Sequence, residues 1–212
     1  MTLTKKNIIN YSLLATLGFF SFLMLRIIFI YIPVQNDVGF LQLKQTYINI
    51  DAWRIAFFVH VFTSMLVLVA GFTQFSKYLL KKHKKLHRTF GYIYVIDVLM
   101  VTGPAGLLMS FYANGGVSSR IAFIILSVLW ISFTAIALIK ALQKDFHAHR
   151  IFMIRSFALT LSAITLRAWK VILAYTTDLG LMDRYRWIAW LGWTINLIVA
   201  EVIIYRKLRI KS

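Results

Sequence analysis

Long apolar runs separated by short polar stretches dominate the chain. Each run is continuous rather than alternating, which is typical of helices and argues against a β-barrel. A hydrocarbon core of roughly 30 Å requires about 20 apolar residues per helical span. Six runs come close to that length, namely residues 11–32, 55–75, 90–111, 121–142, 151–175 and 187–205. The pattern therefore predicts an all-α, polytopic membrane helix bundle with six transmembrane helices.

The overall composition agrees with this pattern. Hydrophobic residues make up 60% of the 212 residues, and the mean hydropathy is +0.74. A water-soluble fold of this size does not need so large an apolar fraction, because its exterior faces water. The runs fill most of the chain, so we expect one integral membrane domain over residues 1–212. The chain contains no cysteine, which excludes disulfides and thiolate metal sites.

The formal net charge of +17 predicts topology rather than nucleic-acid binding. Of the 24 Lys and Arg residues, 15 lie at alternate ends of the runs, in residues 5–6, 77–88, 140–150 and 206–211. Only five lie at the opposite ends. The positive-inside rule places the basic ends in the cytoplasm, so both termini are predicted to be cytoplasmic. We expect membrane lipids as partners, because basic loops attract anionic headgroups, and no nucleic acid.

Two segments depart from the simple alternation of spans and turns. The polar stretch 33–51 contains apolar and aromatic residues, and we expect it to pack back on the bundle or to form a short interfacial helix. The third run contains Gly103-Pro104-Ala105-Gly106. Because Pro104 lacks a backbone N–H, this cluster predicts a kink or a close helix contact.

The phrase His-Arg-x-Phe occurs twice, beginning at His87 and at His149. Each copy follows a basic loop and precedes an apolar run, so the two copies predict equivalent helix entrances at the cytoplasmic face. Four of the five histidines lie in or beside these entrances, namely His83, His87, His147 and His149. Any chemistry that uses imidazole is therefore expected here or at His60.

Several roles are open for these histidines. Neutral imidazole binds heme iron and divalent metals. If their helices adjoin, His87 and His149 would be the axial ligands of a heme b. Arg88 and Arg150 would then neutralise the heme propionates. The alternatives are a metal ion held by His87, His147 and His149, proton transfer, or simple anchoring of the helix starts among lipid headgroups.

Ionisable residues inside spans are costly in a membrane and need partners. Asp97 lies roughly 10 Å inside its span, and Arg155 and Glu201 lie roughly 6 Å inside theirs, at about 1.5 Å of rise per residue. Because these depths form one layer, we expect Asp97 to pair with Arg155, with Glu201 nearby. The pair would fix the helix register, or it would act in function.

A second layer of basic residues lies nearer the outer face. It consists of Arg26, His60 and Arg167, at depths of roughly 8 to 12 Å. This layer would form a pocket for a small anionic or quinone-like ligand, such as a lipid headgroup, a heme propionate or a quinone carbonyl. In the alternative interpretation the arginines extend toward the membrane surface, and His60 bonds to a backbone carbonyl or a hydroxyl.

Two sets of motifs resemble a known family. They are Trp53…His60…Gly71-Phe72-Thr73-Gln74-Phe75 with Leu86-His87-Arg88-x-x-Gly91-x-x-Tyr94 and Gly103-Pro104-x-Gly106, and His149-Arg150-x-x-Met153-Ile154-Arg155-Ser156 with Thr165-Leu166-Arg167. Together they resemble a bacterial family of multi-pass membrane proteins that is classed only as a domain of unknown function. The resemblance runs from about residue 37 to 175. It implies a location in the bacterial inner membrane, and it implies that the six positions to test are His60, His87, Arg88, His149, Arg155 and Arg167.

A weaker likeness is to the diheme b-type membrane cytochromes, in which four consecutive helices hold two hemes between histidine pairs. It implies that His87 and His149 form one pair, but the run 121–142 offers His60 no histidine partner. The leading prediction is therefore a heme-binding electron-transfer protein. The alternatives are a cofactor-free transporter or anion- and lipid-binding protein, and a scaffold within a larger membrane complex. The sequence contains no catalytic triad, phosphate loop or dinucleotide motif, so no enzyme class is predicted.

Overall fold

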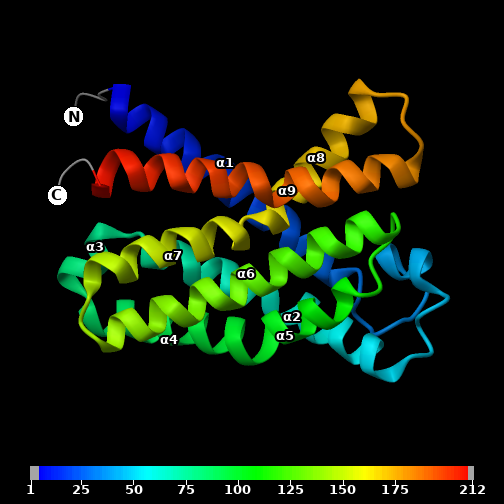
Figure 1. Ribbon diagram of the computed structural model, residues 1–212, viewed down its shortest axis with the longest axis horizontal. Helices are drawn as coiled ribbons and strands as arrows, with labels where there is room; N and C mark the ends of the chain where they lie inside the picture. Colours follow the sequence, from blue (N-terminus) through cyan, green and yellow to red (C-terminus); the bar gives the residue numbers. More distant parts are fainter. Residues whose placement is uncertain (1–4, 210–212) are drawn as a thin grey trace. The chain divides into compact units, whose positions relative to one another are not determined.

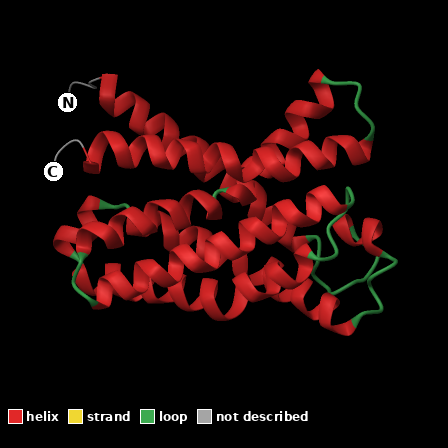
Figure 2. Cartoon of the chain, in the orientation of Figure 1, coloured by secondary structure: helices red, strands yellow, loops and turns green. Residues whose placement is uncertain are grey.

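The computed structural model describes residues 5–209, which form helices, turns and loops without a strand (Figure 1). The helices are joined mostly by short connections (Figure 2). Two compact units, residues 1–48 and 49–212, are each described by themselves. The prediction of an all-helical chain is confirmed.

The first unit contains one long helix and a folded polar stretch. Its elements are α1 (Lys5–Phe29) and the short 3₁₀ helix η1 (Gly39–Lys44). The hydroxyl of Tyr31 accepts a hydrogen bond from the Phe40 N–H at 3.1 Å. The buried ammonium of Lys44 lies 5.5 Å from the ring centre of Phe40 and 5.3 Å from that of Tyr47. The polar stretch after α1 is therefore ordered by its own aromatic side chains.

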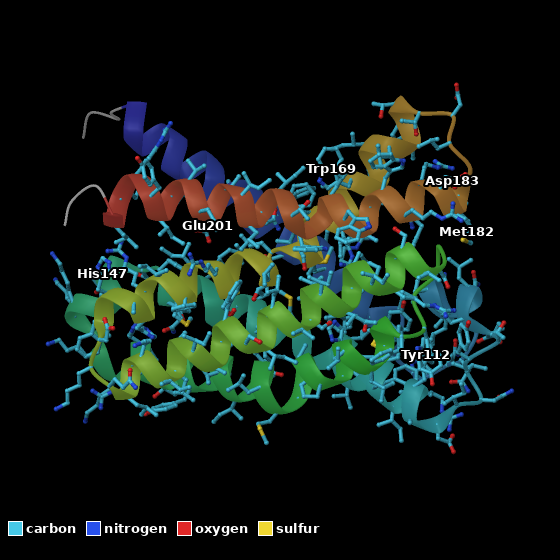
Figure 3. All side chains as sticks on the ribbon, viewed as in Figure 1. Tyr112, His147, Trp169, Met182, Asp183 and Glu201 are labelled. Carbon is cyan, nitrogen blue, oxygen red and sulfur yellow. The ribbon has the colours of Figure 1, made fainter. Side chains whose placement is uncertain are left out.

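The second unit is a bundle of long helices. Its elements are α2 (Asp51–Gln74), α3 (Lys77–Lys82), α4 (Lys84–Ile96), the π-helical turn η2 (Asp97–Val101), α5 (Thr102–Ser110), α6 (Val117–Leu142), α7 (Phe146–Thr160), α8 (Ser162–Thr176), α9 (Leu181–Ile204) and the π-helical turn η3 (Tyr205–Arg209). Helix α6 packs mainly on α7, α2 on α4 and α5, and α8 on α9. His147 lies at one end of this unit and Asp183 at the other (Figure 3). We call the first the basic end, because the Lys- and Arg-rich loops lie there.

Five helical segments of the described residues are long and apolar enough to cross a membrane. They are Asp51–Gln74, Lys84–Ser110, Val117–Leu142, Phe146–Thr176 and Leu181–Leu208. Each contains most of one predicted run, because a continuous apolar run satisfies its backbone only as a helix in lipid. The first predicted run, 11–32, overlaps α1, of which the apolar part Gly18–Phe29 is shorter than a span. The structure therefore shows several spans, and five of the six expected ones by length.

The core of the second unit lies between α2, α4, α6 and α7. Val67, Tyr94 and Val98 are fully buried there, and Phe157 is 8% exposed. Gly71 of α2 allows the close approach of α7, because a Cβ at this position would lie 2.3 Å from the Phe157 ring. Small residues let membrane helices approach in this way.

Two of the spans are interrupted. The span Lys84–Ser110, the third of the predicted runs, changes from α to π winding at Asp97–Val101, directly before the Gly103–Gly106 cluster that predicted a kink. The span Phe146–Thr176, the fifth of the predicted runs, is broken at Leu161, between α7 and α8, where the sequence contains neither glycine nor proline. Both interruptions bring polar groups into the middle of the bundle.

Candidate functional site

The π-helical turn η2 places a carboxyl group inside the span Lys84–Ser110. The Thr102 N–H donates to the carbonyl of Asp97, five residues earlier, and Val101 has φ −124° and ψ −79°, outside helical values. Pro104 contributes to this irregularity, because it cannot donate to the carbonyl four residues before it. Asp97 is 7% exposed. Isolated π turns within helices often occur at functional sites, since they re-aim side chains.

Asp97 is held by hydroxyl groups from two helices. The Thr102 hydroxyl donates to Asp97 Oδ1, and it lies 2.6 Å from the hydroxyl of Thr63 on α2. The Thr63 hydroxyl donates to the Val59 carbonyl at 2.8 Å and lies near the carboxyl group. Thr102 is fully buried. The carboxyl is therefore held by a threonine hydroxyl, in a part of the helix that the membrane would surround.

His60 completes this group of polar side chains. Its Nδ1 donates to the carbonyl of Thr102 at 3.0 Å, and its ring is within electrostatic range of Asp97. Gly106 makes room for the ring, because a Cβ there would lie 3.1 Å from both Nδ1 and Cε1. We refer to His60, Thr63, Asp97 and Thr102 as the Asp97 cluster.

Arg167 of α8 lies near this cluster. Its charge acts on the His60 ring, and its Nη1 donates to the Ala163 carbonyl at 2.5 Å. The structure thus brings together two members of the expected outer basic layer. The third, Arg26, is exposed and belongs to the first unit. His60 is bonded to a carbonyl, as one of the two alternatives expected.

The expected pair of Asp97 with Arg155 is not formed. Arg155 of α7 instead donates to Glu201 of α9 through Nε at 2.5 Å and Nη2 at 2.9 Å. Its guanidinium also lies 5.2 Å from the ring centre of Phe152 and 5.8 Å from that of Phe133. The reason is that the two side chains leave their helices in different directions. Arg155 lies on the face of α7 that packs on α9, whereas Asp97 is turned toward hydroxyls of α2 and α5.

A second polar network links α4, α6 and α7 in the core. The hydroxyl of Tyr94 lies 2.7 Å from those of Ser156 and Thr160. Trp130 Nε1 donates to Thr160 at 3.0 Å, and the Thr134 hydroxyl lies 2.6 Å from that of Ser156. All five side chains are buried. In lipid such a network fixes the mutual rotation of three helices, because each unbonded hydroxyl would be costly.

Asn196 of α9 supports the break between α7 and α8. Its Nδ2 donates to the carbonyl of Ala158 at 3.1 Å and to the hydroxyl of Thr165 at 3.0 Å. In an uninterrupted helix, the Ala158 carbonyl would accept from the N–H of Ser162. Asn196 thus supplies a donor where the helix changes direction.

The histidines of the basic end form a loose pair. His149 Nδ1 donates to the carbonyl of Ala137 on α6 at 2.8 Å. His87 Nδ1 is buried, and it has no hydrogen-bond partner within residues 5–209. The two imidazoles are close enough to interact electrostatically. Arg88 and Arg150, expected near heme propionates, are exposed.

The metal group expected from His87, His147 and His149 is not formed. Among the residues that the structure describes, no three His, Cys, Asp or Glu side chains are grouped so that they could hold a metal ion. His147 is exposed at the start of α7, whereas the His149 ring is directed toward α6. Two residues apart on one helix, their side chains leave in different directions.

Sequence reasoning missed the hydroxyl network and Asn196. Both had a signal in the sequence. Ser156 and Thr160 are four residues apart and share a helix face, as do Trp130 and Thr134. An amide such as Asn196 inside an apolar run is a candidate interhelical bond. Both are uncharged, whereas the membrane penalises ionisable residues most.

The chain belongs to the family described as "Predicted membrane protein (DUF2306)", whose family model matches residues 57–204. The match contains the Asp97 cluster, Arg167 and both His-Arg-x-Phe phrases, and it confirms the resemblance found from the sequence motifs. The family is of unknown function. Neither the curated proteins nor the solved structures contain a match to this chain.

Proposed function

We propose that this member of the DUF2306 family transfers protons across the bacterial inner membrane, without a cofactor, through the Asp97 cluster. In this proposal the chain spans the membrane six times, and both termini are cytoplasmic. Two observations support the topology. Helix α1 has 25 residues, enough for a sixth span, and the basic loops all lie at one end of the second unit.

The observation that carries the proposal is the environment of Asp97. This carboxyl is buried within a span, and among residues 5–209 none of the ion pairs involves it. Membrane proteins retain such a costly group mainly for proton or ion pathways. The Thr102 hydroxyl, itself bonded to Thr63, holds the carboxyl in position, and neither threonine supplies a fixed positive charge.

The groups around Asp97 suit the exchange of a proton. The hydroxyls can pass a proton because each both donates and accepts. His60 is the nearest imidazole, and imidazole changes its charge in the physiological pH range. Beside it, the positive charge of Arg167 would discourage a permanently charged imidazole and would favour a small anionic ligand. A proton would therefore pass between Asp97 and His60 and leave toward the outer face.

Heme-mediated electron transfer is the second candidate. It is favoured by the neighbouring rings of His87 and His149 and by the unbonded Nδ1 of His87. Heme would supply one-electron chemistry, with these two histidines as ligands and Arg88 and Arg150 near the propionates. Against it, buried Tyr94, Met153 and Phe157 belong to the packed core of these helices. We therefore prefer the proton pathway, and a visible spectrum of the purified protein distinguishes the two candidates, because bound heme absorbs strongly.

The test is proton flux into sealed vesicles. The purified protein is reconstituted with a pH-sensitive dye inside, and a potassium diffusion potential, negative inside, is imposed with valinomycin. Wild-type vesicles are expected to acidify faster than empty ones, and Asp97→Asn is expected to abolish the difference. The matched control is Asp183→Asn, which removes an exposed carboxyl from the first turn of α9. This variant is expected to keep the wild-type rate. A folded Asp97→Asn variant with the wild-type rate would overturn the proposal.

A further inference from the structure

The segment that follows α2 is strongly basic. It comprises α3, His83 and the first turn of α4, with Lys81 and Lys82 before His83 and Lys84 and Lys85 after it. Between Asp51 and Asp97 the sequence contains no acidic residue. Within residues 5–209 none of the four lysines forms an ion pair with a carboxylate. Their charge is therefore available to a partner.

The corresponding loop between α6 and α7 differs in this respect. There Lys140 pairs with Asp145 at 3.7 Å. The same Asp145 caps α7, accepting from the Ala148 N–H at 3.0 Å. The two loops occupy equivalent positions in the His-Arg-x-Phe pattern, but only this one contains its own acid. Location at the basic end alone therefore does not account for the excess charge of the first loop.

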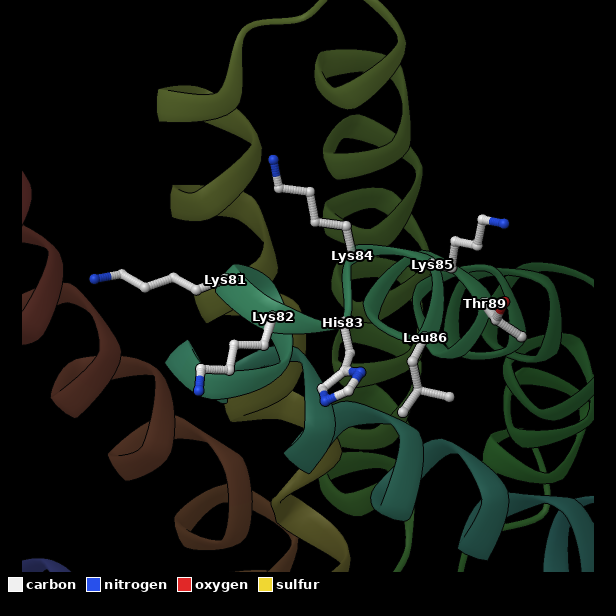
Figure 4. Close-up of a pocket in the computed structure, with 7 residues that line it drawn as sticks. All are labelled: Lys81, Lys82, His83, Lys84, Lys85, Leu86 and Thr89. Atoms are coloured by element: carbon white, nitrogen blue, oxygen red, sulfur yellow. The ribbon is translucent and has the colours of Figure 1, made fainter.

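The shape of the first loop is an open hollow rather than a chelating pocket. Residues 81–86 and Thr89 line a hollow of about 650 Å³. The side chains of Lys81, Lys84 and Lys85 spread away from one another in different directions (Figure 4). A single small anion binds best where several donors converge on it. Ammonium groups that diverge suit several anionic groups spread over a surface.

Apolar side chains accompany the lysines. Tyr78 is 60% exposed, Leu80 is 51% exposed and Leu86 is 43% exposed. Lys82 lies over the ring of Tyr78, at 5.6 Å from its centre. Large apolar groups beside lysines are typical of segments that lie at the boundary between headgroups and acyl chains. The loop would therefore be in contact with the bilayer rather than in bulk water.

We propose that α3, His83 and the first turn of α4, which together form this basic loop, bind the phosphate-bearing headgroups of anionic lipids around the protein. The lysines contact several headgroups, and Tyr78, Leu80 and Leu86 enter the layer below them. The proposal is independent of proton transfer through Asp97, because it concerns a different surface and a different readout. It predicts a local annulus of anionic lipid beside this loop.

The test is lipid selectivity in vesicles of phosphatidylcholine that contain the protein. Electron paramagnetic resonance compares how strongly spin-labelled phosphatidylglycerol and spin-labelled phosphatidylcholine associate with it. The test variant replaces Lys81, Lys82, Lys84 and Lys85 by glutamine. The matched control replaces Lys144, Arg150, Arg206 and Lys207 by glutamine, which removes the same charge from the same end. A variant with arginine at the four test positions keeps the charge and checks the fold.

Wild type is expected to associate more strongly with phosphatidylglycerol than with phosphatidylcholine. In the test variant the ratio of the two association constants is expected to fall about fivefold. The control and the arginine variant are expected to keep most of it. An equal loss in test and control variants would overturn the proposal, since the effect would then be one of total charge. A competition experiment with inorganic phosphate tests whether the loop binds a free anion instead of a lipid headgroup. If phosphate displaced phosphatidylglycerol more strongly than chloride of equal ionic strength, the loop would be a soluble-anion site instead.

Discussion

Arg155 of α7 and Glu201 of α9 form a two-pronged ion pair, with Nε–Oε1 at 2.5 Å and Nη2–Oε2 at 2.9 Å. The guanidinium is also stacked near two phenylalanine rings of α6 and α7. This arrangement engages the guanidinium through two hydrogen bonds and two aromatic contacts, so it fixes α9 against α7. It also explains why Asp97 is left to the threonines, as Arg155 is already neutralised.

Removing this ion pair is expected to destabilise the bundle without affecting proton transfer. Arg155→Gln should lower the free energy of unfolding by about 1–2 kcal/mol, the scale of interhelical polar bonds in membranes. Thermal unfolding in detergent, followed by tryptophan fluorescence, measures the change. Asp183→Asn, which breaks an exposed pair with Arg186 and leaves the Arg186 bond to the Gly115 carbonyl in place, is the control and should change stability by less than about 0.5 kcal/mol. Equal effects of the two variants would show that the inner pair has no special role.

The hydroxyl of Tyr94 is expected to matter more than its ring. Tyr94→Phe keeps the packing but leaves Ser156 and Thr160 without their shared partner. The expected loss is about 1–2 kcal/mol in the free energy of unfolding. Tyr92→Phe removes an exposed hydroxyl from the same helix and should have no measurable effect. If both variants unfolded like wild type, the hydroxyls would be bonding to water instead of one another.

The sequence predicts the helices of this protein better than the partners of its polar side chains. The continuity of the apolar runs predicts the helices, because lipid leaves the backbone no other partner than itself. Counting residues from the ends of the spans predicts that Asp97, Arg155 and Glu201 lie at similar depth in the membrane. Depth does not determine direction around the helix axis, however, and direction decides that Arg155 meets Glu201 rather than Asp97.

The irregular segments were harder to predict. Pro104 predicts a distortion in the span Lys84–Ser110. The π winding lies at Asp97–Val101, on the N-terminal side of this proline. At Leu161 no local signal exists. The break there depends on Asn196, which is distant in sequence and donates to Ala158 from α9. A break that a tertiary contact stabilises cannot be found from local propensity.

The role of Asn196 can be tested by replacing its amide. Asn196→Leu has a similar volume but no donor for the Ala158 carbonyl. We expect faster backbone hydrogen exchange in Ser162–Thr176 and little change in Val117–Leu142. Mass spectrometry of peptides from the detergent-solubilised protein measures both segments. Ile195→Val, which leaves the amide in place, should exchange like wild type, and an unchanged rate in Asn196→Leu would contradict the assigned role.

Gly106 is expected to be important for the position of the His60 ring. Gly106→Ala would place a methyl group 3.1 Å from the imidazole, so the ring must move away from Thr102. We expect a proton flux reduced severalfold, in a protein that still folds. Gly180→Ala is the matched control, since its Cβ would meet only Asp183 Oδ2 at 3.7 Å. A wild-type flux in Gly106→Ala would mean that the His60 bond to Thr102 is not needed.

The central claim is that the Asp97 carboxyl takes up and releases a proton within the membrane. Infrared difference spectroscopy between acidic and alkaline buffer observes this directly, because a protonated carboxyl has its own C=O stretching band, which shifts in D₂O. The account predicts a band that appears on acidification in wild type and in Asp183→Asn, and that is absent in Asp97→Asn. An identical difference spectrum in wild type and Asp97→Asn, over the pH range in which flux occurs, would contradict it.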